Sequence, residues 1–134
     1  MNLNESTAGA AGAAGAAGDN GLDPRTRIRI DLFLARRRAG PGATTLKILA
    51  LRERGRAAGM NGAEMMANEA GDSHDARASA CLAYVAALLA HPRAPAPEAL
   101  RRMHDAGFRP SDIDLVTGRV EEDAKMYRDN RRTT

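Results

Sequence analysis

The sequence predicts an all-α fold: a single small bundle of about six helices over residues 24–130. Three observations favour this fold class. Apolar residues recur at steps of three and four along most of the chain after residue 23. Gly and Pro divide this part into segments of helical length. Aromatic residues are 3% of the chain, whereas Ala, Leu and Met are abundant, and such side chains suit helices rather than strands.

Residues 1–23 contain AGAAGAAGAAG, a run with no side chain large enough to bury. Such a segment cannot recover the entropy cost of becoming ordered, so we expect a disordered tail. It has no Lys, Arg or leucine-rich run, which argues against a secretory signal or a transit peptide. Since no run of about 18 apolar residues follows, we expect a cytoplasmic protein without a membrane partner.

The first two predicted helices carry helical start and stop signals. Asp23 followed by Pro24 is an N-cap with proline at the first helical position, and AGPG at residues 39–42 ends this helix. Thr44 or Thr45 caps the second helix, which ends at Gly59. The inward residues are expected to be Ile28, Leu32 and Ala35 in the first helix, and Leu46, Ile48 and Leu49 in the second.

The third and fourth helices are expected after Asn61 and after Ser73 or Asp75. Asn61 and Glu64 fit a capping-box arrangement, and the short third helix ends near Gly71. The fourth helix has the strongest pattern, a continuous apolar stripe that Pro92 ends. Its inward residues are expected to be Ala78, Cys81, Leu82, Val85, Leu88 and Leu89.

Two more helices complete the predicted bundle. Residues 97–105 form a short helix with Leu100 and Met103 inward, and Gly107 reverses the chain. Ser111 is expected to cap the last helix. Ile113, Val116, Val120, Ala124 and Tyr127 should line one side of it.

The order of caps, turns and small residues over residues 57–116 resembles the carboxymuconolactone decarboxylase and alkylhydroperoxidase D-like family. The matching residues are Ala58-Gly59-Met60, Glu64, Asn68, Gly71, Ser73, Asp75, Arg77 and Ala78, then Ala106-Gly107-Phe108, Ser111-Asp112 and Ile113. The resemblance implies an alkylhydroperoxidase D-like helical bundle. It covers about half the chain and rests on order and spacing rather than on any single distinctive residue.

The peroxidase branch of that family carries Cys-x2-Cys-x3-His on the helix before the Ala-Gly turn. Two thiols on one helix face near its N-terminus favour thiolate, and a base one turn further on relays the proton. Counting back from Gly59, these positions are Thr44, Lys47 and Leu51, and a glutamate that the family often places further upstream would fall near Leu32. None of the three replacements performs the thiol chemistry. The chain is therefore expected to be degenerate, without thiol peroxidase activity.

No other residue set suggests a catalytic, cofactor or metal site. The only cysteine, Cys81, lies on an apolar stripe and is expected to be a small buried hydrophobe. His74 is expected to belong to a solvent-exposed cluster of polar residues that caps a helix. No second His lies at a spacing typical of metal ligands. His91 and His104 fit helix ends. The decarboxylase-like branch needs no thiol, so such an activity stays open, although the sequence identifies no acid and base for it.

The uneven distribution of charge along the chain indicates which kinds of partner the protein could bind. Residues 24–56 carry ten Arg or Lys and two acids, whereas residues 57–130 carry eight bases and twelve acids. We expect the basic residues to be matched by acidic faces of the same fold or of a neighbouring subunit. The alternative is a basic nucleic-acid-binding or regulatory module. It is not favoured, because residues 36–38 (RRR) spread around a helix and no aromatic residues are interleaved for base stacking.

Small apolar side chains bury little area each, so a bundle of this composition often gains burial by pairing with copies of itself. We therefore expect a homo-oligomeric, non-catalytic paralogue without a cofactor. A small-molecule ligand beside Lys47, at the former redox position, is the other expectation.

Overall fold

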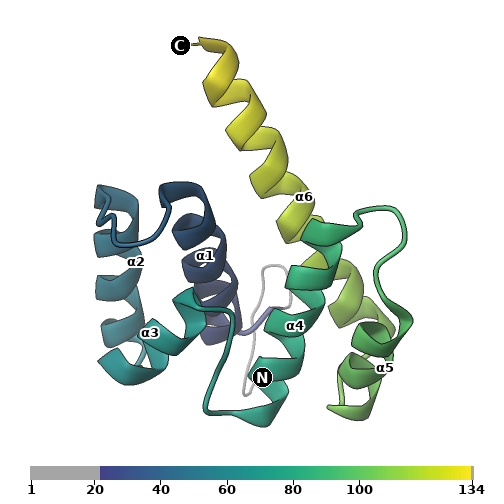
Figure 1. The fold of residues 1–134 in the computed structure, drawn as a ribbon. Helices are drawn as coiled ribbons and strands as arrows, with labels where there is room; N and C mark the ends of the chain where they lie inside the picture. The colour runs from purple at the N-terminus through teal and green to yellow at the C-terminus, as the bar shows by residue number, and fades with distance from the viewer. Residues whose placement is uncertain (1–21, 134) are drawn as a thin grey trace, which may run out of the picture.

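The structure, a computed structural model, describes residues 22–133, and the predicted tail lies outside the described residues as far as residue 21. The described part contains six helices and no strand, which confirms the all-α prediction (Figure 1). The helices are α1 (Pro24–Ala39), α2 (Leu46–Ala57), α3 (Gly62–Glu69), α4 (Ala76–Ala90), α5 (Pro97–Asp105) and α6 (Pro110–Thr133).

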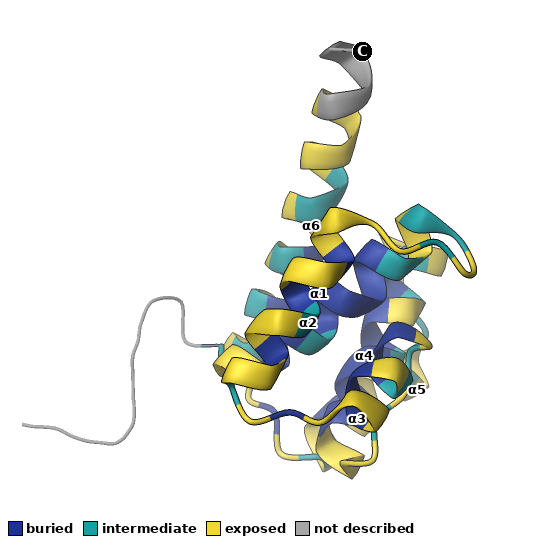
Figure 2. Cartoon of the chain, turned by 90° about the vertical axis from the view of Figure 1, so that its left-hand side faces the viewer, coloured by how far each residue is buried: buried dark blue, intermediate teal, exposed yellow. Residues whose placement is uncertain are grey.

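Helix α1 lies between the two halves of the bundle. Helices α2 and α3 pack on one side of it, and α4 lies on the other side together with α5 and α6 (Figure 1). Apolar residues of α1 belong to two separate clusters. Ile28, Leu32 and Ala35 pack with Ile48, Leu51, Met60 and Met65, while Ile30, Phe33 and Leu34 pack with residues of α4, α5 and α6. Consequently α1 is buried around most of its circumference (Figure 2).

The predicted N-caps at the starts of the first four helices are confirmed, and the structure decides between the alternatives. Thr45 rather than Thr44 caps α2, and Asp75 rather than Ser73 caps α4. Each capping side chain accepts a hydrogen bond from the backbone N–H three residues on, which satisfies a donor that the helix itself leaves free. The four bonds join Asp23 to Thr26, Thr45 to Ile48, Asn61 to Glu64 and Asp75 to Ala78.

The predicted cap of the last helix is wrong. Helix α6 begins at Pro110, so Ser111 lies inside its first turn. The capping acceptor is the Asp112 carboxylate, which accepts a hydrogen bond of 3.0 Å from the backbone N–H of Arg109. Proline is already set to helical φ and has no N–H to leave unsatisfied, which explains the earlier start.

Three leucines that were expected to point inward are exposed. Leu46 and Leu49 of α2 are 85% and 46% exposed, and Leu100 of α5 is 36% exposed. The buried face of α2 is instead formed by Ile48, Leu51 and Gly55, because this face allows α2 to approach α1 and α3 closely. In α5 Met103 is fully buried, and Ala99 packs, partly buried, against the same cluster.

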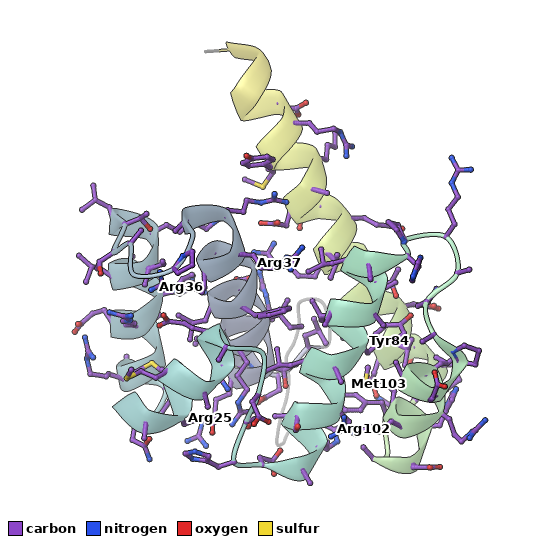
Figure 3. The ribbon with its side chains drawn as sticks, viewed as in Figure 1. Arg25, Arg36, Arg37, Tyr84, Arg102 and Met103 are labelled. Atoms are coloured by element: carbon purple, nitrogen blue, oxygen red, sulfur yellow. The ribbon has the colours of Figure 1, made fainter. Side chains whose placement is uncertain are left out.

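Helix α4 packs against α1, α5 and α6. Its predicted stripe is buried from Ala78 to Leu88, and Leu89 is partly buried against the same cluster. Tyr84 is buried as well, and its hydroxyl lies 3.1 Å from the Thr117 hydroxyl of α6. Figure 3 shows Tyr84 and Met103 in the region where α4 meets α5 and α6.

Helix α6 continues beyond the body of the bundle. Its apolar side is buried at Ile113, Val116 and Val120, but Ala124 is only partly buried and Tyr127 is 38% exposed. Residues 121–133, named the α6 arm below, span about 20 Å at 1.5 Å per residue and project away from the other helices (Figures 1 and 2). The predicted inward stripe is therefore correct for the first half of the helix and wrong at Tyr127.

Gly55 is the place where α2 approaches its neighbours most tightly. A Cβ added there would overlap the thioether of Met65 and lie 3.6 Å from Ile28. Helix propensity alone favours Ala over Gly by about 1 kcal/mol. However, Met65 is 1% exposed, so its thioether would have to shift within the apolar cluster to make room.

We predict that Gly55→Ala lowers the free energy of unfolding by about 1 kcal/mol, because overpacking outweighs propensity. The matched control is Gly118→Ala in α6, where nothing lies within 4 Å of the added Cβ. That variant should gain about 0.5–1 kcal/mol. Urea unfolding followed by circular dichroism measures both, and equal stabilisation of the two variants would show that α2 is not in tight contact with α3.

Candidate functional site

The structure does not bring the three positions of the family redox motif into one site. Thr44 precedes the N-cap of α2 and is exposed, and Lys47 is exposed in the first turn of that helix. Leu51 is 3% exposed and belongs to the apolar cluster between α1, α2 and α3. Two of the positions therefore face solvent, and the third fills the core.

Cys81 is a buried free cysteine, as predicted. It is 2% exposed and packs in the cluster of α1, α4, α5 and α6. Burial raises the pKa of its thiol to about 12, although the positive charges of Arg77 and Arg29 act in the opposite direction. The thiolate is the nucleophile in cysteine chemistry, so this side chain is not suited to peroxide reduction.

The histidines lie at the surface and at helix ends. His91 is the C-cap of α4, and His104 is exposed in the last turn of α5. The His74 side chain is 68% exposed, with Nδ1 3.6 Å from Glu64 Oε1. Among residues 22–133, no group of three or more His, Cys, Asp or Glu side chains has an arrangement that would hold a metal ion.

Glu64, in the first turn of α3, accepts hydrogen bonds from four other residues. Its Oε1 accepts from the backbone N–H of His74 at 2.8 Å. Its Oε2 accepts from Asn68 Nδ2 at 2.9 Å, from Arg29 Nε at 3.1 Å and from the Ser73 hydroxyl. One carboxylate thus joins α1, α3 and the loop that leads into α4.

The surroundings of Glu64 keep it ionised. Burial raises the pKa of this carboxyl, but hydrogen bonds from Ser73, His74 and Asn68 and the charge of Arg29 outweigh burial and lower the pKa to about 2. A group with this pKa does not exchange protons near neutral pH, and general acid or base catalysis requires such exchange. Glu64 is therefore a structural anchor rather than a catalytic residue.

Sequence reasoning missed this cluster. It placed Glu64 in a capping box, and the backbone N–H of Glu64 does bond to the Asn61 side chain. The Glu64 carboxylate, however, turns away to residues up to 35 positions distant. Asn68 is fully buried beside it and donates to both Glu64 and the Asp72 carbonyl, while its own Oδ1 has no hydrogen-bond partner in the described part of the chain.

A second carboxylate, Glu69 at the end of α3, joins three segments. Arg36 of α1 and Arg52 of α2 bond to it at 2.9 Å and 2.8 Å. Burial raises the pKa of Glu69, but the two arginines outweigh it, so that the pKa lies below its ordinary value. Arg36 also donates to the carbonyls of Gly40 and Ala43, which fixes the turn between α1 and α2.

Two further ion pairs join α1 to α6. Arg119 of α6 bonds to the buried Asp31 at 2.8 Å, and Arg38 bonds to Asp123 at 2.8 Å. The Arg38 guanidinium also lies over the Tyr127 ring, 3.9 Å from its centroid. These contacts hold the base of the α6 arm against the C-terminal end of α1.

The basic segment 24–56 is thus matched in part by acids of the same chain, as predicted. Arg29, Arg36, Arg38 and Arg52 pair with acids from residues 57–130. Figure 3 shows that Arg36 and Arg37 occupy different sides of α1, so consecutive arginines do not form one charged face. Arg27, Arg37, Lys47 and Arg54 have no ion-pair partner among the described residues.

Comparison of the chain with protein-family models, with curated proteins and with solved structures gave no match. Within residues 22–133, no helix has the length and apolar content needed to cross a membrane. The internal geometry of the chain therefore carries the functional conclusions.

The Glu64 cluster predicts how stability depends on pH. The folded-state pKa of about 2 lies below the ordinary value of 4.5, so the carboxylate stabilises the fold fully above about pH 4.5 and loses its contribution as the pH falls towards 2. At pH 7, Glu64→Gln should lower the free energy of unfolding by about 2 kcal/mol. The difference from the wild type should shrink between pH 4.5 and pH 3.

Urea unfolding at pH 7, 5 and 3 measures this difference. The control is Glu53→Gln, which removes an exposed carboxylate that pairs only with Arg56 and should change stability by less than about 0.5 kcal/mol at every pH. A Glu64→Gln penalty that stays constant from pH 7 to pH 3 would contradict the ionised anchor.

Proposed function

We propose that this chain is a divergent relative of the carboxymuconolactone decarboxylase and alkylhydroperoxidase D-like family that has no thiol peroxidase activity and acts as a non-catalytic, self-assembling protein. The observation that carries this proposal is the state of its only cysteine. Cys81 is buried, the pKa of its thiol is raised to about 12, and it lies far along the chain from the family's redox positions.

The titratable groups support the non-catalytic part of the proposal. A decarboxylase-like reaction needs an acid or base that exchanges protons near neutral pH. Glu64 and Glu69 are buried, but both have a lowered pKa and accept hydrogen bonds from arginine, other side-chain or backbone donors. Their bonds stabilise the fold and leave no free carboxylate at these two positions for a substrate.

The exposed apolar side chains support the assembly part. Leu46, Leu49 and Met126 are 85%, 46% and 53% exposed, and they lie on two long helical faces rather than in loops. Exposed apolar surface on helices is typical of protein–protein contacts. By contrast, Thr44 and Lys47 lie at the surface, so the former redox positions offer no enclosed site for a small ligand.

The nucleic-acid alternative receives less support from the geometry. Five of the ten basic residues of segment 24–56 are held in ion pairs with acids of the same fold. Phosphate binding would have to compete for those arginines. Retention of a generic DNA duplex with a steep salt dependence would favour this alternative over the proposal.

The direct test is a peroxide-reduction assay with a dithiol donor on the full chain. We expect no turnover above buffer, and the same result for Cys81→Ser, because no accessible thiolate is present. As an independent readout, a thiol-reactive dye should label Cys81 in urea and leave it unlabelled in the folded protein. Turnover that survives Cys81→Ser would refute the proposal, and so would rapid labelling of the folded chain.

A further inference from the structure

We propose that the α6 arm of one copy docks antiparallel on the outer face of α2 of a second copy, and that the two copies exchange arms reciprocally to form a dimer. This inference deepens the proposed assembly function, on which it rests, by naming the surface and the partner. It starts from two exposed helical faces, one on the α6 arm and one on α2.

The first face is on the α6 arm. Glu122, Met126 and Asp129 follow one another at steps of four and three, so they lie on one side of the helix. Met126 is 53% exposed. Among the described residues Glu122 pairs with Arg119, and its side chain stays 62% exposed. Asp129 is exposed without an ion-pair partner in the described residues. This face is a methionine flanked by two carboxylates, with the exposed Lys125 at its edge.

The second face is on α2. Leu46, Leu49 and Ala50 form an exposed apolar surface at helical spacing. Lys47 and Arg54 flank it on the same side, seven residues apart, and neither has an ion-pair partner in the described part of the chain. This face is a small apolar surface with two cations along one edge, and it also carries the exposed Glu53, which pairs with Arg56.

The two faces match in spacing and in charge. Lys47, Ala50 and Arg54 are separated by steps of three and four, which is the order of the arm read backwards. Antiparallel packing therefore places Glu122 beside Arg54, Met126 over the small Ala50, and Asp129 beside Lys47. Within each helix the two charged residues are seven positions apart, which corresponds to about 10 Å at a rise of 1.5 Å per residue. In a parallel arrangement the order of the steps would not match, so the charged residues and Met126 could not all lie opposite their partners.

Reciprocal exchange follows from the composition of each copy. Each chain carries one acidic arm and one basic α2 face, so a two-fold pair forms both contacts at once and leaves neither face open. A single contact between two short helix faces is small for a stable interface, whereas two contacts double the buried area.

The primary experiment is size-exclusion chromatography with light scattering on the full chain over a concentration series. We expect twice the chain mass of 14.2 kDa at high concentration and a shift towards one chain mass on dilution. Met126→Glu and Ala50→Glu should each raise the dissociation constant by at least about tenfold. The matched control is Met66→Glu, since Met66 is also exposed, at 68%, but lies on α3; it should leave the constant unchanged.

A charge exchange tests the register. Lys47→Glu with Arg54→Glu should weaken the dimer, and Glu122→Lys with Asp129→Lys should weaken it as well. All four substitutions in one chain restore opposite charges across the contact and should restore dimerisation. All four positions are exposed, so the substitutions are not expected to disturb the core. Circular dichroism checks that each variant folds.

A chain that stays monomeric at every concentration would overturn this inference, as would a dimer insensitive to Met126→Glu, or a four-fold variant that remains monomeric. These outcomes can be told apart from failure of the proposed function. Peroxide turnover would refute the non-catalytic assignment while leaving the interface test intact. A dimer insensitive to Met126→Glu would remove only this interface, whereas a monomer without peroxidase activity would remove the interface and the assembly part of the proposed function and leave the non-catalytic part.

Discussion

The burial of α1 between two apolar clusters is the constraint on which the rest of the fold depends. Ile28, Leu32 and Ala35 face α2 and α3, while Ile30, Phe33 and Leu34 face the cluster of α4, α5 and α6. A helix that is apolar on two sides must be enclosed on both. Neither half of the bundle can bury its own apolar face without α1, so both halves depend on the same sixteen residues.

The polar side chains of α1 fix where the other helices lie. Arg29 and Arg36 reach α3, whereas Asp31 and Arg38 reach α6. Ion pairs of this kind contribute little net stability when exposed, but the desolvated partners Glu64, Glu69 and Asp31 would be costly to leave unpaired. The high basic charge of this segment therefore serves internal positioning to a large extent, and the Arg38 contacts set the direction in which the α6 arm leaves the body.

The sequence predicted features that depend on neighbouring residues and missed contacts between residues that are far apart in the chain. Helix number, most caps and the stripe of α4 follow from short-range rules, and the structure confirms them. Which side of α2 is buried could not be predicted from the sequence. Leu46 and Leu49 fit the helical period as well as Ile48 and Leu51 do, and only the position of α1 decides which of these residues face the core. Asp31 and Arg119 are 88 residues apart, and no local pattern indicates that they meet. The absence of a Cys-x2-Cys-x3-His motif, in contrast, is visible from the cysteine count alone.

Native-state hydrogen exchange on Leu32→Ala tests the central role of α1 most directly. Leu32 is fully buried and belongs to the cluster shared with α2 and α3, and its truncation should cost about 3 kcal/mol. If α1 couples the two halves, amide protection in α4 should fall by the same free energy as protection in α2 and α3. Protection that falls in α2 and α3 while α4 keeps its wild-type value would contradict a bundle built on one shared helix.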